Sequence, residues 1–181
     1  MKIRKTNENG FTLIEVIVTL VLVGITATLA GMWIVSVANG YVFTKTNAST
    51  VQKAQLAMTR LSKEFSAISA VTATTPTPTS ITYTRTNETL GVDTVTVSLN
   101  GNDLEITVNG VGPNILTDSV SGFTLRYCSN SQLNQTTCSR TAWAPPPSGE
   151  EPSKIIEISL TLKAGSNTPV PFVQRVIPRN L

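Results

Sequence analysis

The sequence predicts an α+β fold in which a long N-terminal helix packs on an antiparallel β-sheet head. No charged residue occurs from Val16 to Thr44, and no proline interrupts the chain between Val16 and Ala70. From residue 72 onward the chain becomes rich in threonine, valine and isoleucine. Apolar and polar residues alternate there, which is typical of half-buried strands. The change near residue 72 therefore separates a helical part from a β-rich head, residues 72–181.

Composition argues against the commonest enzyme chemistries. The chain has 181 residues and no histidine, so it lacks the commonest general base and the commonest metal ligand. We predict that it is not an enzyme, and assign no catalytic residue, no metal site and no cofactor. The net charge of +3 includes Lys2, Arg4 and Lys5 against Glu8, so the remainder has 11 basic and 10 acidic residues, a net charge of +1. Nucleic acid is not an expected partner.

The uncharged run from Val16 to Thr44 is long enough to cross a bilayer, because a spanning helix needs only about 20 apolar residues. Lys2, Arg4 and Lys5 precede the run. The excess of cations on the cytoplasmic side of membrane helices places this end in the cytoplasm and the chain beyond residue 45 on the far side. We therefore predict a transmembrane helix over residues 11–44.

Residues 45–71 are predicted to form an amphipathic helix that continues the first one, so that a single helix runs from about Phe11 to Ser69. Its apolar residues recur at steps of three and four, which places them on one face. This expected buried stripe consists of Val51, Ala54, Met58, Leu61, Phe65 and Ile68. The other faces carry Gln52, Lys53, Gln55, Arg60, Lys63 and Glu64. The first half of the helix would then lie in lipid or against other helices, and the second half on a sheet.

Strands are predicted wherever apolar residues alternate in the second part of the chain. The clearest hairpin joins residues 95–99 to residues 104–108 through the turn signal Asn100-Gly101, since Asn-Gly favours two-residue hairpin turns. A further turn is expected at Asn109-Gly110. Other expected strands cover residues 81–83, 123–127, 156–162 and 172–177.

Cys128 and Cys138 enclose nine residues of a polar stretch. Two cysteines at this spacing are expected to form a disulfide in an oxidising compartment, which agrees with the predicted topology. Two unpaired thiols are the alternative. The loop that follows contains prolines 145–147 and 152, which would stiffen it.

Gly10 is followed by Phe11-Thr12-Leu13-Ile14-Glu15, behind a short basic leader and ahead of the apolar run. This pattern resembles the processing site of type IV prepilins and pseudopilins. The resemblance implies that a prepilin peptidase cleaves between Gly10 and Phe11, removes leader residues 1–10 and methylates the new amine of Phe11. It also implies a pilin-like fold and a bacterial inner-membrane precursor, single-pass with its head in the periplasm. The mature chain would later lie in a pilus or pseudopilus, and its partners would be an inner-membrane assembly platform and other pilin subunits, contacted through the N-terminal helix.

Glu15 lies at the entrance of the apolar run. A carboxylate in hydrocarbon costs roughly 2.5 to 3.5 kcal/mol on insertion scales, so it needs a cation. The resemblance implies an assembly salt bridge with the terminal amine of a neighbouring subunit, although the chain's own Phe11 amine is also within reach. Gly24, Ala27 and Gly31 place small residues on one face of the helix, where another helix could approach closely.

Two alternatives assign the apolar run differently, as a secretory signal peptide cleaved near Ala38 or as a plain membrane anchor. Neither explains Glu15.

Within the pilin family, residues 48–71 and 173–181 are similar to the J-type pseudopilins of type II secretion and the W-type minor pilins. This similarity implies a minor subunit that primes assembly.

Two further functions remain alternatives to a structural subunit. A tip adhesin or DNA-uptake pilin would need a basic stripe, for which the candidates are Arg126, Arg140, Arg175 and Arg179. A membrane-tethered hydrolase without histidine would need a Ser-Lys or a paired-carboxylate site, and the adjacent carboxylates Glu150-Glu151 are better explained as solvated charge.

Overall fold

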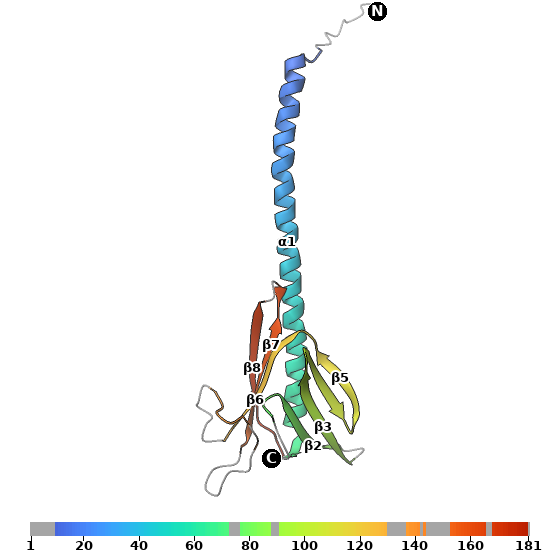
Figure 1. Cartoon of the computed structure of the whole chain (residues 1–181), viewed down its shortest axis with the longest axis vertical. Helices are drawn as coiled ribbons and strands as arrows, with labels where there is room; N and C mark the ends of the chain where they lie inside the picture. Colours follow the sequence, from blue (N-terminus) through green and yellow to red (C-terminus); the bar gives the residue numbers. More distant parts are fainter. Residues whose placement is uncertain are drawn as a thin grey trace, which may run out of the picture. The chain divides into compact units, whose positions relative to one another are not determined.

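The computed structural model describes residues 10–72, 77–87, 91–129, 137–141, 143, 153–165 and 168–180. One long helix, α1 (Leu13–Ser66), precedes a set of antiparallel strands, and the predicted α+β, pilin-like architecture is confirmed (Figure 1). The chain divides into two compact units, one up to Thr44 and one from Lys45 onward. The strands are β1 (Ile68–Val71), β2 (Ser80–Asn87), β3 (Gly91–Asn100), β4 (Asp103–Val108), β5 (Val111–Thr117), β6 (Val120–Cys128), β7 (Ile155–Lys163) and β8 (Pro169–Val176).

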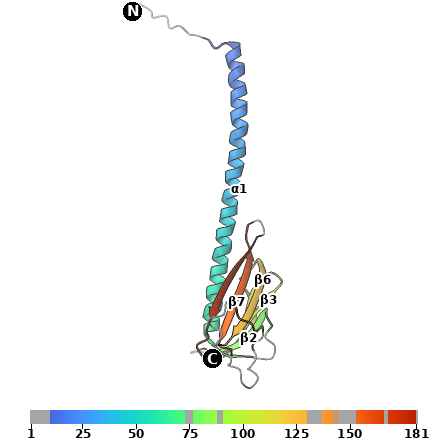
Figure 2. The same cartoon turned by 90° about the vertical axis from the view of Figure 1, so that its left-hand side faces the viewer.

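The strands form two antiparallel meanders. The first sheet has the order β1-β2-β3-β4-β5 and the second has the order β6-β7-β8, so each strand pairs with its neighbour in sequence. The view in Figure 2 shows β6 and β7 side by side in the second sheet. The chain passes from the first sheet to the second through two residues, Asp118 and Ser119. Such local connectivity requires no long crossover.

The predicted hairpin at Asn100-Gly101 is confirmed. It joins β3 to β4, and Val97 lies opposite Ile106 in the register. The expected turn at residues 109–110 joins β4 to β5. Asn109 and Gly110 have φ values of 51° and 77°, as a two-residue turn with both central residues in the left-handed region requires.

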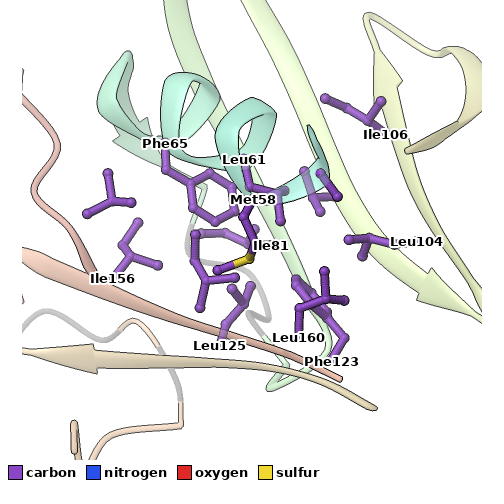
Figure 3. Close-up of a cluster of buried hydrophobic side chains, with 14 of the residues drawn as sticks. Met58, Leu61, Phe65, Ile81, Leu104, Ile106, Phe123, Leu125, Ile156 and Leu160 are labelled. Atoms are coloured by element: carbon purple, nitrogen blue, oxygen red, sulfur yellow. The ribbon is translucent and has the colours of Figure 1, made fainter. Parts of the chain in front are cut away.

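One hydrophobic core is shared by the second half of α1 and both sheets. The buried residues of α1 all lie between Thr50 and Phe65, as the amphipathic pattern predicts for this half. Burying each large apolar side chain contributes about 1.5 to 3 kcal/mol relative to leaving it exposed. Figure 3 shows Met58, Leu61 and Phe65 from α1 beside Ile81, Leu104, Leu125 and Leu160 from the strands.

The helix ends earlier than its apolar pattern predicts. It stops at Ser66 instead of about Ser69, and Ile68 lies in β1, where it remains buried and pairs with Arg85. The backbone N–H of Arg179 donates to the carbonyl oxygen of Ser66 at 3.1 Å, which satisfies one of the carbonyls that a helix end leaves free. Val51 is also a correction, because its side chain is exposed instead of buried.

A disulfide joins Cys128 to Cys138, and both residues are buried. The segment after Cys138 pairs with β6, since the backbone N–H of Tyr127 donates to the carbonyl of Arg140 at 2.9 Å. Trp143 then packs edge-on against Tyr127, with ring centroids 5.5 Å apart. The disulfide therefore holds the returning segment beside β6, the edge strand of the second sheet. The prolines at 145–147 and 152 and the pair Glu150-Glu151 lie outside the described residues.

Candidate functional site

Thr12 and Glu15 form the start of α1. The backbone N–H of Glu15 donates to the Thr12 carbonyl at 3.1 Å and lies 3.4 Å from the Thr12 hydroxyl, while Val16 N–H donates to the same carbonyl at 3.3 Å. Thr12 thus occupies the N-cap position and Glu15 the third helical position. Threonine followed three residues later by glutamate is the pattern of a capping box. This role was not predicted from the sequence, although Thr-Leu-Ile-Glu at residues 12–15 has the capping-box pattern.

Capping offsets only part of the cost of a charge at this position. An N-cap and a negative charge at a helix N-terminus each contribute on the order of 1 kcal/mol. Placing a carboxylate inside hydrocarbon costs roughly 2.5 to 3.5 kcal/mol. If Glu15 enters the membrane, an additional positive group is therefore required. The leader cations Lys2, Arg4 and Lys5 lie outside the described residues.

The bond between Gly10 and Phe11 is accessible. Both residues precede the first turn of α1, and the Phe11 side chain is 80% exposed. A Cβ atom added at Gly10 would meet no atom within 4 Å. None of the described residues therefore shields this peptide bond, and a requirement for glycine would come from an enzyme that binds here.

The first half of α1 has the properties of a membrane span. Within the described residues, α1 is the one helix long and apolar enough to cross a membrane, with a mean hydropathy of 2.4 in its most apolar window. Its threonine hydroxyls donate to carbonyls of the same helix, including Thr19 to Val16 at 2.9 Å and Thr28 to Ile25 at 2.8 Å. Polar groups satisfied inside the helix need no water. Large apolar side chains are exposed along this half, from Phe11 to Phe43.

Gly24, Ala27 and Gly31 lie on this half of α1 and are exposed. A Cβ atom at Gly24 or Gly31 would meet nothing within 4 Å. The small face predicted from their spacing is thus open, with room for the backbone of another helix to approach.

The start of the chain matches one family model. Residues 5–31 match the model described as the prokaryotic N-terminal methylation motif. The chain carries a prokaryotic N-terminal methylation motif. The match includes Gly10, Phe11 and Glu15. A membrane-anchored precursor fits both the motif and the apolar helix that carries it. No curated protein matches the chain.

Beyond the methylation motif, the head contains a buried charge network that sequence reasoning missed. Glu64 was assigned to a polar face of α1, yet its side chain is only 3% exposed. It accepts from Arg85 of β2 and Arg60 of α1, and Arg85 also contacts Asp93 of β3 at 3.3 Å. The pair Arg60 and Glu64 was readable from its i, i+4 spacing. The partners on β2 and β3 were not, because only the folded chain brings them to the helix.

Two of the arginines considered for a basic stripe, Arg126 and Arg175, lie on either side of the same acidic residue, Glu157, in the described structure. Arg175 donates to the buried carboxylate of Glu157 at 2.8 Å, and Arg126 lies opposite Glu157 in the register of β6 and β7. Arg140 contacts Ser153 at 3.4 Å, while Arg179 lies at the end of α1. Among the described residues, no group of three or more acidic, histidine or cysteine side chains could hold a metal ion.

Proposed function

We propose that the chain is the precursor of a minor, assembly-priming structural subunit of a type IV pilus or a type II secretion pseudopilus. The observation that carries this proposal is the match of the methylation motif over residues 5–31, which leads directly into the apolar half of α1. The accessible bond at Gly10 supports cleavage there. Residues 1–10 would be the cytoplasmic leader, and the head would lie in the periplasm until assembly.

Cleavage would create a positive group for Glu15. A free amine at Phe11 has an ordinary pKa of about 8 and remains cationic after one methylation. The exposed apolar side chains between Phe11 and Phe43 would pass from lipid to contacts with neighbouring helices, with Gly24 and Gly31 allowing close approach. Pairing Glu15 with a neighbour's amine is favourable chiefly relative to leaving either charge unpaired. The ion pair would therefore select one register between subunits more than it would add affinity.

The assignment to the minor subunits rests on the similarity of residues 48–71 and 173–181 to the J-type pseudopilins and W-type minor pilins. The hydrogen bond from Arg179 to Ser66 supports treating these two segments as one structural feature, because it joins the end of the chain to the end of α1. The two functions in which the head binds a ligand or DNA receive no such support, since Arg175 is neutralised by Glu157.

Processing can be tested by replacing Gly10 with valine and expressing the full chain in cells that contain a prepilin peptidase. We expect the Gly10→Val precursor to accumulate, whereas the wild-type chain should begin at a methylated Phe11 in intact-mass spectrometry. Gly40→Val is the matched control, because a Cβ atom at Gly40 also meets nothing within 4 Å. A Gly10→Val chain that still begins at Phe11 would contradict the proposed cleavage. A wild-type chain that begins near Asn39 would identify a discarded signal peptide instead.

A further inference from the structure

A hollow of about 320 Å³ lies in the unit that begins at Lys45, between the start of its helix, the turn from β5 to β6 and the end of β7. Lys45, Ser49 and Lys53 follow each other at four-residue intervals and therefore share one face of α1. The charged and serine side chains that line the hollow are those of Lys45, Ser49, Lys53, Asp118, Ser119 and Lys163.

The hollow has an excess of positive charge. Lys53 contacts Asp118 at 2.6 Å, and this hydrogen bond lowers the pKa of the Asp118 carboxyl, which therefore stays charged at neutral pH. In the described part of the chain, the ammonium groups of Lys45 and Lys163 have no ion-pair partner. Three lysines against one carboxylate leave two positive charges, and the hydroxyls of Ser49 and Ser119 add hydrogen-bond donors. A phosphate group suits this set of charges and donors.

The walls of the hollow are held by bonds that do not involve the side chains of Lys45 and Lys163. The backbone N–H of Lys163 donates to the carbonyl of Ser119 at 3.0 Å. The backbone N–H of Gly165 donates to the side-chain oxygen of Asn47, also at 3.0 Å. Replacing the ammonium groups of Lys45 and Lys163 by neutral amides should therefore leave the shape of the hollow unchanged.

Lys45, which lines the hollow, directly follows the uncharged run from Val16 to Thr44 in the sequence. Leu13 and Tyr41 are 28 residues apart in this helix, which corresponds to about 42 Å. A bilayer including its headgroup regions is about 40 to 45 Å thick, and tyrosine is enriched at its interfaces. With Leu13 at the inner interface, Tyr41 falls at the outer one. Lys45 comes one helical turn later, about 48 Å from Leu13, just outside the headgroup layer, where its long side chain can reach back toward the outer phosphates.

We propose that this hollow binds the phosphate of an anionic phospholipid headgroup while the precursor is held in the membrane. The inference rests on the proposed membrane-anchored state. It adds a lipid specificity that the methylation motif does not imply. A lysine near an anionic surface contributes about a fivefold gain in affinity, so Lys45 and Lys163 together would contribute roughly 25-fold if their effects multiply.

The test titrates phosphatidylglycerol or phosphatidylcholine into the detergent-solubilised full-length chain and measures the Kd of the first bound lipid by native mass spectrometry. We expect phosphatidylglycerol to bind the wild-type chain more tightly. In Lys45→Gln/Lys163→Gln, its affinity should fall roughly 25-fold, while phosphatidylcholine binding should not change. The matched control is Lys63→Gln/Lys154→Gln, which removes the same charge from the same unit and should keep the preference. Near-UV circular dichroism establishes that each variant is folded.

Two results would overturn the inference. One is an equal preference for phosphatidylglycerol in the Lys45→Gln/Lys163→Gln chain and the wild type. The other is binding of inorganic phosphate with a lower Kd than phosphatidylglycerol, which would identify a site for soluble phosphate. The processing of each chain at Gly10 is measured separately. A processed chain without lipid preference refutes only this inference, and an unprocessed chain that keeps the preference refutes only the proposed function.

Discussion

Arg85 of β2 donates a hydrogen bond to Glu64 of α1, whose carboxylate is almost completely buried. The same guanidinium contacts Asp93 of β3 at 3.3 Å, and Arg60 approaches the other oxygen of Glu64 at 2.8 Å. Burial alone disfavours the charged form of Arg85, yet the carboxylate of Glu64 raises the pKa of its guanidinium above the ordinary value. The guanidinium of Arg85 therefore stays charged at physiological pH, and its contacts join the helix to the first sheet at one register.

Replacing Arg85 with methionine should lower the free energy of unfolding by about 3 to 5 kcal/mol, because it leaves Glu64 buried without its least exposed partner. Arg60→Met is the matched control. It removes the other cation from the same carboxylate, but Arg60 is half exposed, so its loss should cost about 1 kcal/mol or less. Urea unfolding of the full chain in detergent, followed by near-UV circular dichroism, measures both. Equal losses for the two variants would show that burial does not govern this network.

The head should lose stability above pH 10 through its buried tyrosines. Burial, followed by the charge of Glu64, raises the pKa of Tyr83 above its ordinary value of 10.0, and burial raises that of Tyr127. The folded chain keeps these protons where the unfolded chain releases them. Their contribution to stability is therefore full below about pH 10 and is lost as the pH rises.

Each tyrosine that ionises only on unfolding steepens the fall in unfolding free energy by up to about 1.4 kcal/mol per pH unit. Tyr83→Phe should reduce that slope between pH 10 and pH 11, and Tyr83→Phe/Tyr127→Phe should reduce it further. At neutral pH, Tyr83→Phe should cost only about 1 kcal/mol, for its 3.3 Å hydrogen bond to Glu64. Urea midpoints across this pH range measure the slopes. An unchanged slope in the double variant would refute the assignment.

Removing the disulfide with Cys128→Ser/Cys138→Ser should lower the stability of the head by about 2 to 4 kcal/mol, since the bridge restricts the unfolded chain. The near-UV signal of Trp143 should also weaken, because the bridge holds the segment that brings this ring to Tyr127. Reductant should destabilise the wild-type chain by a similar amount and leave the variant unchanged. A wild-type chain insensitive to reductant would mean that the bridge contributes nothing.

Two substitutions at Glu15 separate its roles as a helix cap and as an ion-pair partner. Glu15→Leu should leave membrane insertion intact but impair incorporation into filaments. Glu15→Gln keeps a side chain that functions in a capping box and removes the charge, so it should fail in the same way. Incorporation is measured as the ratio of variant to wild-type chain in sheared filaments. Normal incorporation of Glu15→Gln would show that capping alone explains the residue.

Local patterns in the sequence predicted much of the fold. The alternation around Asn100-Gly101 was sufficient for the β3 to β4 hairpin, because the turn residues and the apolar faces agree on one register. The two strands absent from the prediction, β1 and β5, lack such agreement. Ile68 continues the helical spacing of Leu61 and Phe65, but pairing with β2 places it in a strand. Val111 and Ile115 of β5 are exposed, so this edge strand has no buried face to reveal it.

The functional sites, like the fold, include features that the sequence predicts and features that depend on tertiary contacts. The pattern from Gly10 to Glu15 is contiguous and readable in the chain, as is the uncharged run behind it. The partners of Glu64 and the hollow beside Lys45 combine residues far apart in sequence, and no local pattern connects them. Even Val51, which has the correct spacing for the buried stripe, is exposed, whereas its neighbour Thr50 is buried, since burial depends on which face of the helix the head covers.

The sequence by itself determined that a long helix with an apolar first half precedes a β-rich head, and that a methylation motif covers residues 5–31. Hydrophobic periodicity, turn residues and the exclusion of charge from lipid act over a few neighbouring residues, so they can be read along the chain. Only the tertiary structure decided where α1 ends, which of its polar residues is buried and which lysines converge. Those outcomes depend on desolvation and charge pairing between segments that only folding brings together.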